Sequence, residues 1–190
     1  MLMIDIETLG LQPGAPIPTI GYCHFGWDGI KDHGTIAINI ENWRSAKPDP
    51  ATIKFWLRQS PEAIAKTFFR DEQQTWVEAL IALAGTVRHS QIYGDGVWAN
   101  GPLFDLGHLE YWYDQMSEKT PWSHRDPRDC RTLYEIANRL TKWDRNAATI
   151  YLKEMHPNLV EHDAEHDAIL QALLIIDAND ALCALAGVRK

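Results

Sequence analysis

Two acidic side chains, Asp5 and Glu7, lie two residues apart in a short apolar stretch near the start of the sequence. A β-strand repeats every second residue, so both carboxylates would project from one face while Ile4 and Ile6 point into the core. Adjacent carboxylates repel each other unless a proton or a cation lies between them. The pair therefore suggests half of a divalent-metal site, and a solvent-exposed strand end is the plain alternative.

Asp105 and the segment around His162 supply the other candidate groups. Asp105 follows an apolar strand at the start of a predicted helix, where the helix dipole favours a carboxylate, and an acid that only caps the helix is the alternative. His162 comes five residues before Asp167, at the start of a long apolar helix. Five residues turn a helix through about 500°, so His162 can work beside Asp167 only from the preceding loop.

A zinc site is a competing interpretation of the same segment. His162 and His166 are four residues apart with Glu165 between them, which also suits the H-x-x-E-H form of metalloprotease motif. That motif needs a further carboxylate downstream, and only three aspartates follow Glu165. A zinc site would also leave the early acids unexplained, so the sequence favours a site built from carboxylates.

The elements that must position these groups change from strands to helices along the chain. Strands are expected at the stretch carrying Asp5, at 19–25 and at 35–40, and their short connections predict an antiparallel meander. A further strand is expected at 97–99. Helices are expected over 51–59, from a cap at Asp71 through Trp76, Leu80 and Leu83, and over 103–116, 133–140 and 164–186. This order predicts an α/β fold with a mixed sheet in one domain spanning 1–190.

Composition bounds the surroundings of the protein. With 190 residues, of which 45% are hydrophobic, the chain can bury a core of its own. Three widely separated cysteines argue against a disulfide framework and a structural zinc site, so a reducing cytoplasm is expected. The longest apolar stretch is interrupted by Asp177 and Asp180, which predicts no membrane span and no signal peptide.

The charge is unevenly distributed. A net charge of -8 argues against binding nucleic acid through an overall positive field. Residues 119–153 nevertheless carry eight basic and four acidic side chains, a local excess of four positive charges. This segment could guide a phosphate backbone, and a solvated charged surface explains it nearly as well.

Together, Asp5-x-Glu7, Asp105 and His162-x-Ala164-x-x-Asp167 resemble the DEDD superfamily of 3′-to-5′ exonucleases, in its histidine-bearing branch, DEDDh. Within that superfamily, residues 5–10, 53–60, 100–105 and 127–133 look like the phage exodeoxyribonuclease A group, which includes a related bacterial exoribonuclease branch. The resemblance extends from residue 5 to about residue 172 and implies a ribonuclease H-like fold, with a central mixed five-stranded sheet flanked by helices.

The resemblance also implies a two-metal phosphodiester hydrolase. Two divalent cations, Mg²⁺ or Mn²⁺, would be bound by Asp5, Glu7, Asp105 and Asp167, with Asp5 bridging both. Glu7 and Asp167 would serve the ion that activates water, and Asp105 the other ion. His162 would be the general base, because a histidine titrates near neutrality. The product would be a nucleoside 5′-monophosphate.

The implied partner is the 3′ end of single-stranded DNA or RNA, with DNA favoured. Thr8 and Leu9 continue the strand that carries the acids, and Leu9 resembles the family position that wedges against the last base. Trp56 and Gln59 are candidates for stacking on that base and hydrogen bonding to it, although the helical spacing of Trp56 with Ile53 favours a core position for Trp56. Asn100 completes the candidate substrate-binding set.

Three alternatives to a deoxyribonuclease follow from the same residues. One is an exoribonuclease with the same site, and another is a zinc peptidase. The third is a nucleic-acid-binding module without catalysis, which the sequence disfavours because every required acid and the histidine are present. A homodimer is a further expectation.

Overall fold

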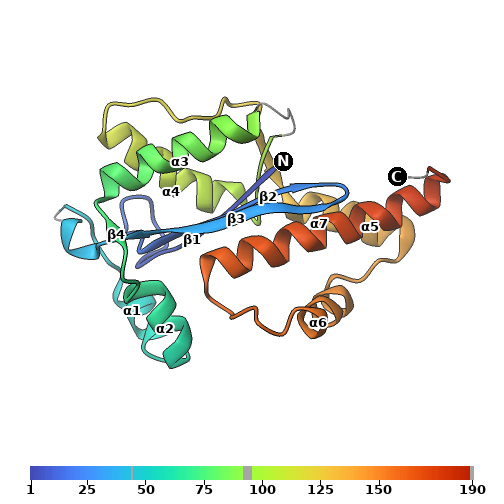
Figure 1. Cartoon of the computed structure of the whole chain (residues 1–190), viewed down its shortest axis with the longest axis horizontal. Helices are drawn as coiled ribbons and strands as arrows, with labels where there is room; N and C mark the ends of the chain where they lie inside the picture. Colours follow the sequence, from blue (N-terminus) through green and yellow to red (C-terminus); the bar gives the residue numbers. More distant parts are fainter. Residues whose placement is uncertain (44, 92–95, 189–190) are drawn as a thin grey trace.

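The computed structural model describes residues 1–43, 45–91 and 96–188. Six strands form one mixed sheet in the order β4-β3-β2-β1-β5-β6 (Figure 1). The strands are β1 (Leu2–Glu7), β2 (Thr19–Gly26), β3 (Gly29–Ile38), β4 (Gln73–Gln74), β5 (Val97–Ala99) and β6 (Pro127–Asp129). The first three form the predicted antiparallel meander, whereas β5 pairs with β1, β6 with β5 and β4 with β3 in parallel. The predicted five strands are one too few, because the two-residue β4 extends the sheet at its β3 edge.

Seven α-helices lie in the described ranges. They are α1 (Pro50–Trp56), α2 (Pro61–Phe68), α3 (Trp76–Gln91), α4 (Pro102–Gln115), α5 (Cys130–Thr141), α6 (Arg145–Met155) and α7 (Ala164–Ala186), with a short 3-10 helix η1 (Ile40–Asn42) before α1. The prediction of one helix over 51–59 is wrong in its end, because α1 stops at Trp56 and a second helix starts at Pro61 with Ser60 as its N-cap. The predicted cap at Asp71 is wrong, because Thr75 and Glu78 cap α3. The Glu78 carboxylate accepts hydrogen bonds from the Thr75 backbone N–H and hydroxyl, and the Thr75 hydroxyl accepts one from the Glu78 backbone N–H.

The alternation of side chains along β1 divides the protein into two cores. Leu2, Ile4 and Ile6 are buried in the core that contains the inward residues of α3 and α4. Met3 lies in the other core, which contains the inward residues of α5 and α7. Because side chains alternate, Asp5 shares the face of Met3, the face covered by α5 and α7 (Figure 1).

The start of α7 lies directly against the middle of β2. Gly21 of β2 is the register partner of Asp5, and a β-carbon at Gly21 would lie 2.0 Å from the carbonyl carbon of Ala164 and 2.3 Å from the backbone nitrogen of Glu165. No side chain larger than hydrogen fits between the two backbones. Gly21 therefore sets how closely the first turn of α7 approaches the strand that carries Asp5.

The length of α7 corrects one expectation from the sequence. This helix has 23 residues and an 18-residue window of mean hydropathy 1.7, so by length and composition alone it could cross a membrane, despite Asp177 and Asp180. In the structure 44% of that window is buried, and eight residues of the helix are buried, from Ala164 to Ala178. A core helix of a soluble protein passes the same test of length and composition.

Replacing Gly21 by alanine is expected to separate α7 from the sheet. The added methyl group would overlap backbone atoms, which cannot rotate away, so we expect a loss of about 3 kcal/mol in the free energy of unfolding. Chemical denaturation measures this change. Gly85→Ala is the matched control, because Gly85 lies within α3 with nothing near its β-carbon position and should gain about 0.5–1 kcal/mol. Equal stability of the two variants would contradict the tight contact.

Candidate active site

The end of β1 is open on one side, and Asp105 fills the opening. β5 pairs with β1 only at Leu2 and Met3, so the later backbone N–H groups of β1 have no strand on that side. Asp105, in the first turn of α4, accepts a hydrogen bond from the Ile6 backbone N–H at 3.3 Å. The divergence of the two strands thus brings a buried carboxylate from α4 next to those of β1.

The first turn of α7 supplies Asp167 and, through the preceding loop, His162. Asp163 caps the helix, accepting hydrogen bonds from the backbone N–H groups of Glu165 and His166. Asp163 is itself buried and paired with Arg70, two residues after the end of α2, at 2.8 Å and with Lys66 of α2 at 3.4 Å. A buried carboxylate without cationic partners would be strongly destabilising, so these ion pairs hold the N-terminus of α7 against the end of α2.

His162 lies in the loop before α7, as the spacing to Asp167 requires. Its backbone has a φ of 60°, in the left-handed region that is uncommon outside glycine. Three contacts support this conformation. The His162 backbone N–H donates to Asp167 Oδ2 at 3.2 Å, its carbonyl accepts from Thr67 Oγ1 at 3.1 Å, and its ring packs edge-on against Phe55 with centroids 5.1 Å apart.

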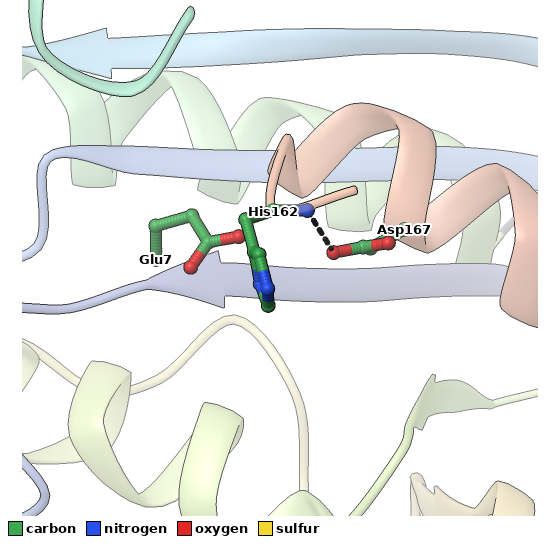
Figure 2. A group of neighbouring side chains, drawn as sticks. All are labelled: Glu7, His162 and Asp167. Atoms are coloured by element: carbon green, nitrogen blue, oxygen red, sulfur yellow. Dashed lines mark hydrogen bonds between the residues drawn. The ribbon is translucent and has the colours of Figure 1, made fainter. Parts of the chain in front are cut away.

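Glu7, His162 and Asp167 converge on one point. One ligand atom from each, two carboxylate oxygens and an imidazole nitrogen, lie within 4.8 Å of one another. Figure 2 shows the imidazole between the two carboxylates, with Glu7 at the end of β1 and Asp167 on the first turn of α7. The structure thus brings Glu7 next to two residues that are 155 and 160 positions away in the sequence.

Asp5 lies beside this cluster and is held by α7. Its Oδ1 accepts a hydrogen bond from Gln171 Nε2 at 2.7 Å, one turn after Asp167. Burial raises the pKa of Asp5 well above its ordinary value, and the charges of Asp105, Glu7 and Asp167 raise it further, whereas the Gln171 hydrogen bond lowers it. All four acids are therefore close enough to affect one another electrostatically.

The other three carboxylates show the same effect of burial. Burial raises the pKa of Asp105 to about 7 and that of Asp167 to about 6. It also raises the pKa of Glu7 well above its usual range, and the nearby charges of Asp167, Asp163 and Asp105 add to the shift. Two buried and two half-buried acids without enough partners destabilise the ionised protein, and a bound cation would relieve that repulsion.

The donor atoms suit a hard divalent cation. Glu7, Asp167, Asp5 and Asp105 offer carboxylate oxygens, the ligands that Mg²⁺ and Mn²⁺ prefer. His162 is the one nitrogen donor in the cluster formed with Glu7 and Asp167. The residues present therefore fit divalent ions bound mainly by oxygen.

The zinc motif does not assemble in the described part of the chain. His166 Nδ1 accepts a hydrogen bond from the Val160 backbone N–H at 2.9 Å, which occupies one of its ring nitrogens. Both oxygens of Glu165 are engaged as well, by Thr35 Oγ1 and by His33 Nδ1, each at 2.7 Å. His166 and Glu165 thus stabilise the start of α7 and the loop before it.

A pocket of about 350 Å³ opens beside Glu7. Thr8, Phe55, Trp56 and Phe104 are among the side chains that line it. Trp56 is only 4% exposed, and its Nε1 donates to the Thr8 carbonyl at 2.9 Å, so it belongs chiefly to the packed interior and forms a wall of the pocket. Thr8 is also buried, with its hydroxyl donating to the Gly10 carbonyl at 2.8 Å.

The remaining substrate-binding candidates lie elsewhere. Leu9 lines a second, larger pocket of about 540 Å³ that shares Trp56 as a wall. Gln59 falls in the turn after α1, where its Nε2 donates to the Phe55 carbonyl at 3.1 Å, and it is not among the described residues lining either pocket. Asn100 lies in the turn between β5 and α4. None of these three residues is among those described as lining the pocket beside Glu7.

Comparison with known proteins identifies the family. Residues 1–177 match the model of the 3′-5′ exoribonuclease Rv2179c-like domain. The chain belongs to this family. It is accordingly a 3′-5′ exonuclease, a phosphodiester hydrolase, and the predicted membership of the DEDDh branch is confirmed. The narrower resemblance to the phage exodeoxyribonuclease A group stays a prediction. Among curated proteins, none matches the sequence significantly.

Solved structures of exonucleases share the fold at low sequence identity. The nuclease domain of 3′hExo, a DEDDh family member bound to rAMP, is 14% identical with a TM-score of 0.59, over 96% of this chain and 92% of that one. A 3′-exonuclease from a study of histone mRNA stem-loop recognition is 13% identical with a TM-score of 0.60, over 96% and 82%. Exonuclease X with 5′ overhanging duplex DNA is 20% identical with a TM-score of 0.53, over 94% and 90%. The predicted ribonuclease H-like α/β fold is confirmed.

Sequence reasoning missed several residues that position the site. Gly21 carries no chemistry, and its importance depends on a contact with a helix more than 140 positions away. Gln171 could have been noticed, because it is a polar residue at helical spacing from Asp167 in an otherwise apolar helix. Arg70 and Lys66 gave no signal, since the sequence does not show that they face the cap of α7.

The metal-free protein is expected to lose stability as the pH rises from about 4 to about 7. The unfolded chain releases protons from its acids near pH 4, whereas folded Asp167 and Asp105 keep theirs until about pH 6 and about pH 7. The folded state binds more protons in this window, so its added stability is complete below pH 4 and is lost as the pH passes the folded pKa values. Thermal unfolding in a chelator measures the trend.

Asp105→Asn is the internal comparison for this prediction. It removes one of the acids with a raised pKa and keeps an oxygen that can accept the Ile6 N–H, so its melting temperature should fall less between pH 4 and pH 7 than that of the unmodified protein. Addition of Mg²⁺ or Mn²⁺ at pH 8 should raise the melting temperature of the unmodified protein more than that of the variant. Parallel pH profiles for the two proteins would refute the buried-acid repulsion.

Proposed function

We propose that the protein removes nucleotides from single-stranded 3′ ends, with Asp5, Glu7, Asp105, Asp167 and His162 as the catalytic set. The observation that carries this proposal is the convergence of Glu7, His162 and Asp167 within 4.8 Å, near the half-buried Asp5 and the buried Asp105. Two divalent cations, Mg²⁺ or Mn²⁺, when bound, would polarise the phosphodiester, generate the attacking hydroxide and stabilise the departing 3′ oxygen.

The chain's own residues divide the work. Asp5, Glu7, Asp105 and Asp167 provide the negative charge that retains divalent ions and fixes where a phosphate can bind. His162 accepts the proton of the attacking water at its imidazole, a role that the contacts to Phe55, Thr67 and Asp167 support by fixing the loop. The product is a nucleoside 5′-monophosphate.

The pocket beside Glu7 is suited to the terminal nucleoside. Its walls include the rings of Phe55, Trp56 and Phe104, which can stack on or enclose a base without reading its identity. The pocket is next to the metal-binding carboxylates, so a nucleoside in it would place its 5′ phosphate near them. A base paired in a duplex could not enter such a pocket, which supports the single-strand requirement.

We propose RNA as the first substrate to test, since the family description names an exoribonuclease. The sequence resemblance favoured DNA, and that expectation stays untested. Among the structural neighbours, one was solved with rAMP and another with duplex DNA, so this fold accommodates either sugar in those proteins.

Loss of one acid or of the histidine should abolish or slow the release of nucleotides. Asp167→Asn is expected to abolish Mg²⁺-dependent release of nucleotides from a 3′-labelled single strand, and His162→Ala to slow it by about 10² to 10⁴-fold. Electrophoretic separation of the released labelled mononucleotide from the intact strand measures both rates. Asp114→Asn and His156→Ala, which change exposed residues, are the controls and should retain full activity.

Full activity of Asp167→Asn would overturn the proposed metal site, and a rate of His162→Ala within a few-fold of the unmodified protein would remove His162 as the base. Strand binding without metal-dependent release by the unmodified protein would instead favour the non-catalytic binding module.

Matched oligonucleotides should reveal the sugar preference. We expect faster initial release from a single-stranded RNA than from the DNA of the same sequence, and no release from either when the 3′ end is blocked. Initial rates at equal concentration, with a 5′ label, measure this. A faster rate on DNA would restore the preference expected from the sequence, and release from blocked ends would contradict an exonuclease mechanism.

A further inference from the structure

Arg131 is an exposed cation at the rim of the site, outside the set already described. It lies in the first turn of α5, where its backbone N–H donates to the capping Asp129 at 3.0 Å. Its guanidinium covers Gly101 in the turn between β5 and α4. A β-carbon at Gly101 would lie 2.9 Å from Nη1, 3.0 Å from Cζ and 3.1 Å from Nη2.

Gly101 makes this approach possible in two ways. It has no side chain, and its φ of 110° is a conformation that other residues rarely adopt. The turn is therefore shaped so that the guanidinium can lie close to the backbone that leads into α4. Four residues further along α4 is Asp105, the acid that reaches the end of β1.

The positive charge of Arg131 reaches the acids but is not neutralised by them. Burial raises the pKa of Asp105, and two backbone hydrogen bonds and then the charge of Arg131 lower it, so the guanidinium is within electrostatic range. None of the side-chain ion pairs among the described residues includes Arg131. The guanidinium thus keeps hydrogen-bond donors available for a ligand.

A strand approaching this site needs such a group. The protein carries a net charge of -8, and four carboxylates lie at the centre, so the phosphates of a substrate meet an unfavourable field. The guanidinium has a planar fork of donors that matches the oxygens of a phosphate. Arg131 also explains part of the positive excess over residues 119–153 that the catalytic set leaves unused.

The position of Arg131 indicates which phosphate it would contact. The side chains lining the pocket beside Glu7 come from β1, the loop after it, α1 and its cap, and α4, and Arg131 is not among those described. A strand whose last nucleoside occupies that pocket must leave the centre by another side. Arg131 lies over Gly101, at the turn that leads into α4 and to Asp105.

We propose that Arg131 binds the phosphate that follows the scissile one toward the 5′ end of the strand, and so holds the part of the substrate that remains after cleavage. This inference rests on the proposed exonuclease function. It makes Arg131 a substrate-positioning residue: it acts on how the strand is held, and it takes no part in the proton transfer or in metal binding.

A substrate with only one phosphodiester separates this role from the chemistry. The p-nitrophenyl ester of thymidine 5′-monophosphate contains the bond to be cleaved but no following phosphate. Arg131→Gln should therefore leave its Mn²⁺-dependent hydrolysis unchanged. On a single-stranded oligonucleotide the same variant should raise KM by about 10- to 100-fold with kcat within a few-fold, the effect of one lost charged hydrogen-bond pair.

The salt dependence gives a second readout. The slope of log KM against log salt for the oligonucleotide should fall by about 0.7, the value for one phosphate contact to a single strand. Arg131→Lys should keep most of that slope while raising KM, because it retains the charge and loses the fork. Arg139→Gln, on the same helix and 3.9 Å from an exposed Glu135, is the matched control and should change none of these values.

Three results would overturn the proposal. An equal loss on both substrates would show that Arg131 acts through Asp105 at the metal centre, and unchanged kinetics on the oligonucleotide would show no phosphate contact. A kcat effect without a KM effect would show a role in the reaction itself. Failure of the unmodified protein to shorten either an RNA or a DNA oligonucleotide with Mn²⁺ would count against the proposed function, whatever Arg131 does.

Discussion

The close contact between β2 and the start of α7 at Gly21 decides where the site can form. Asp5 and Glu7 depend only on the alternation of β1, but Asp167 and His162 come from the far end of the chain and reach β1 only because α7 lies against the neighbouring strand without an intervening side chain. Once this contact exists, the other parts of the site have defined places. Gln171 meets Asp5 one turn later, and the cap of α7 falls within reach of Lys66 in α2 and Arg70 just after it.

The repulsion among the buried acids works against this arrangement. Burial raises the pKa of each of the four carboxylates, so the ionised, metal-free site weakens the fold that surrounds it. The protein offsets the repulsion only in part, through hydrogen bonds from the Ile6 and His162 backbones and from Gln171. The incomplete compensation is consistent with a function that needs an unsatisfied negative field, because a site neutralised by its own side chains would have no affinity for a divalent ion.

Much of the fold could be predicted because the relevant signals are local. The strand at 97–99 and the helix from Ala164 to Ala186 agree with the structure in both bounds, since a short apolar run and a capped apolar helix are visible in sequence. β4 and β6 are too short for any periodicity, and the separate α2 depends on one turn at Ser60. Helical spacing alone could not separate a packed Trp56 from a substrate contact, and the structure gives it both environments. Gly21 and Arg131 acquire their meaning only from contacts between distant segments.

The attachment of α2 to the loop before α7 has a consequence for how nucleoside binding relates to the orientation of His162. Thr67 donates a hydrogen bond to the carbonyl of His162, Arg70 pairs with the neighbouring cap Asp163, and Phe55 packs on the imidazole while forming a wall of the pocket beside Glu7. Because Phe55 contacts both, binding of a ligand in that pocket is coupled to the orientation of the imidazole. By thermodynamic reciprocity, a nucleoside that favours the oriented ring is itself bound more tightly when the ring is oriented. We infer that such coupling would make the reaction depend on an occupied pocket. Without a terminal nucleoside, the His162 imidazole would be held less firmly in the orientation needed to accept a proton.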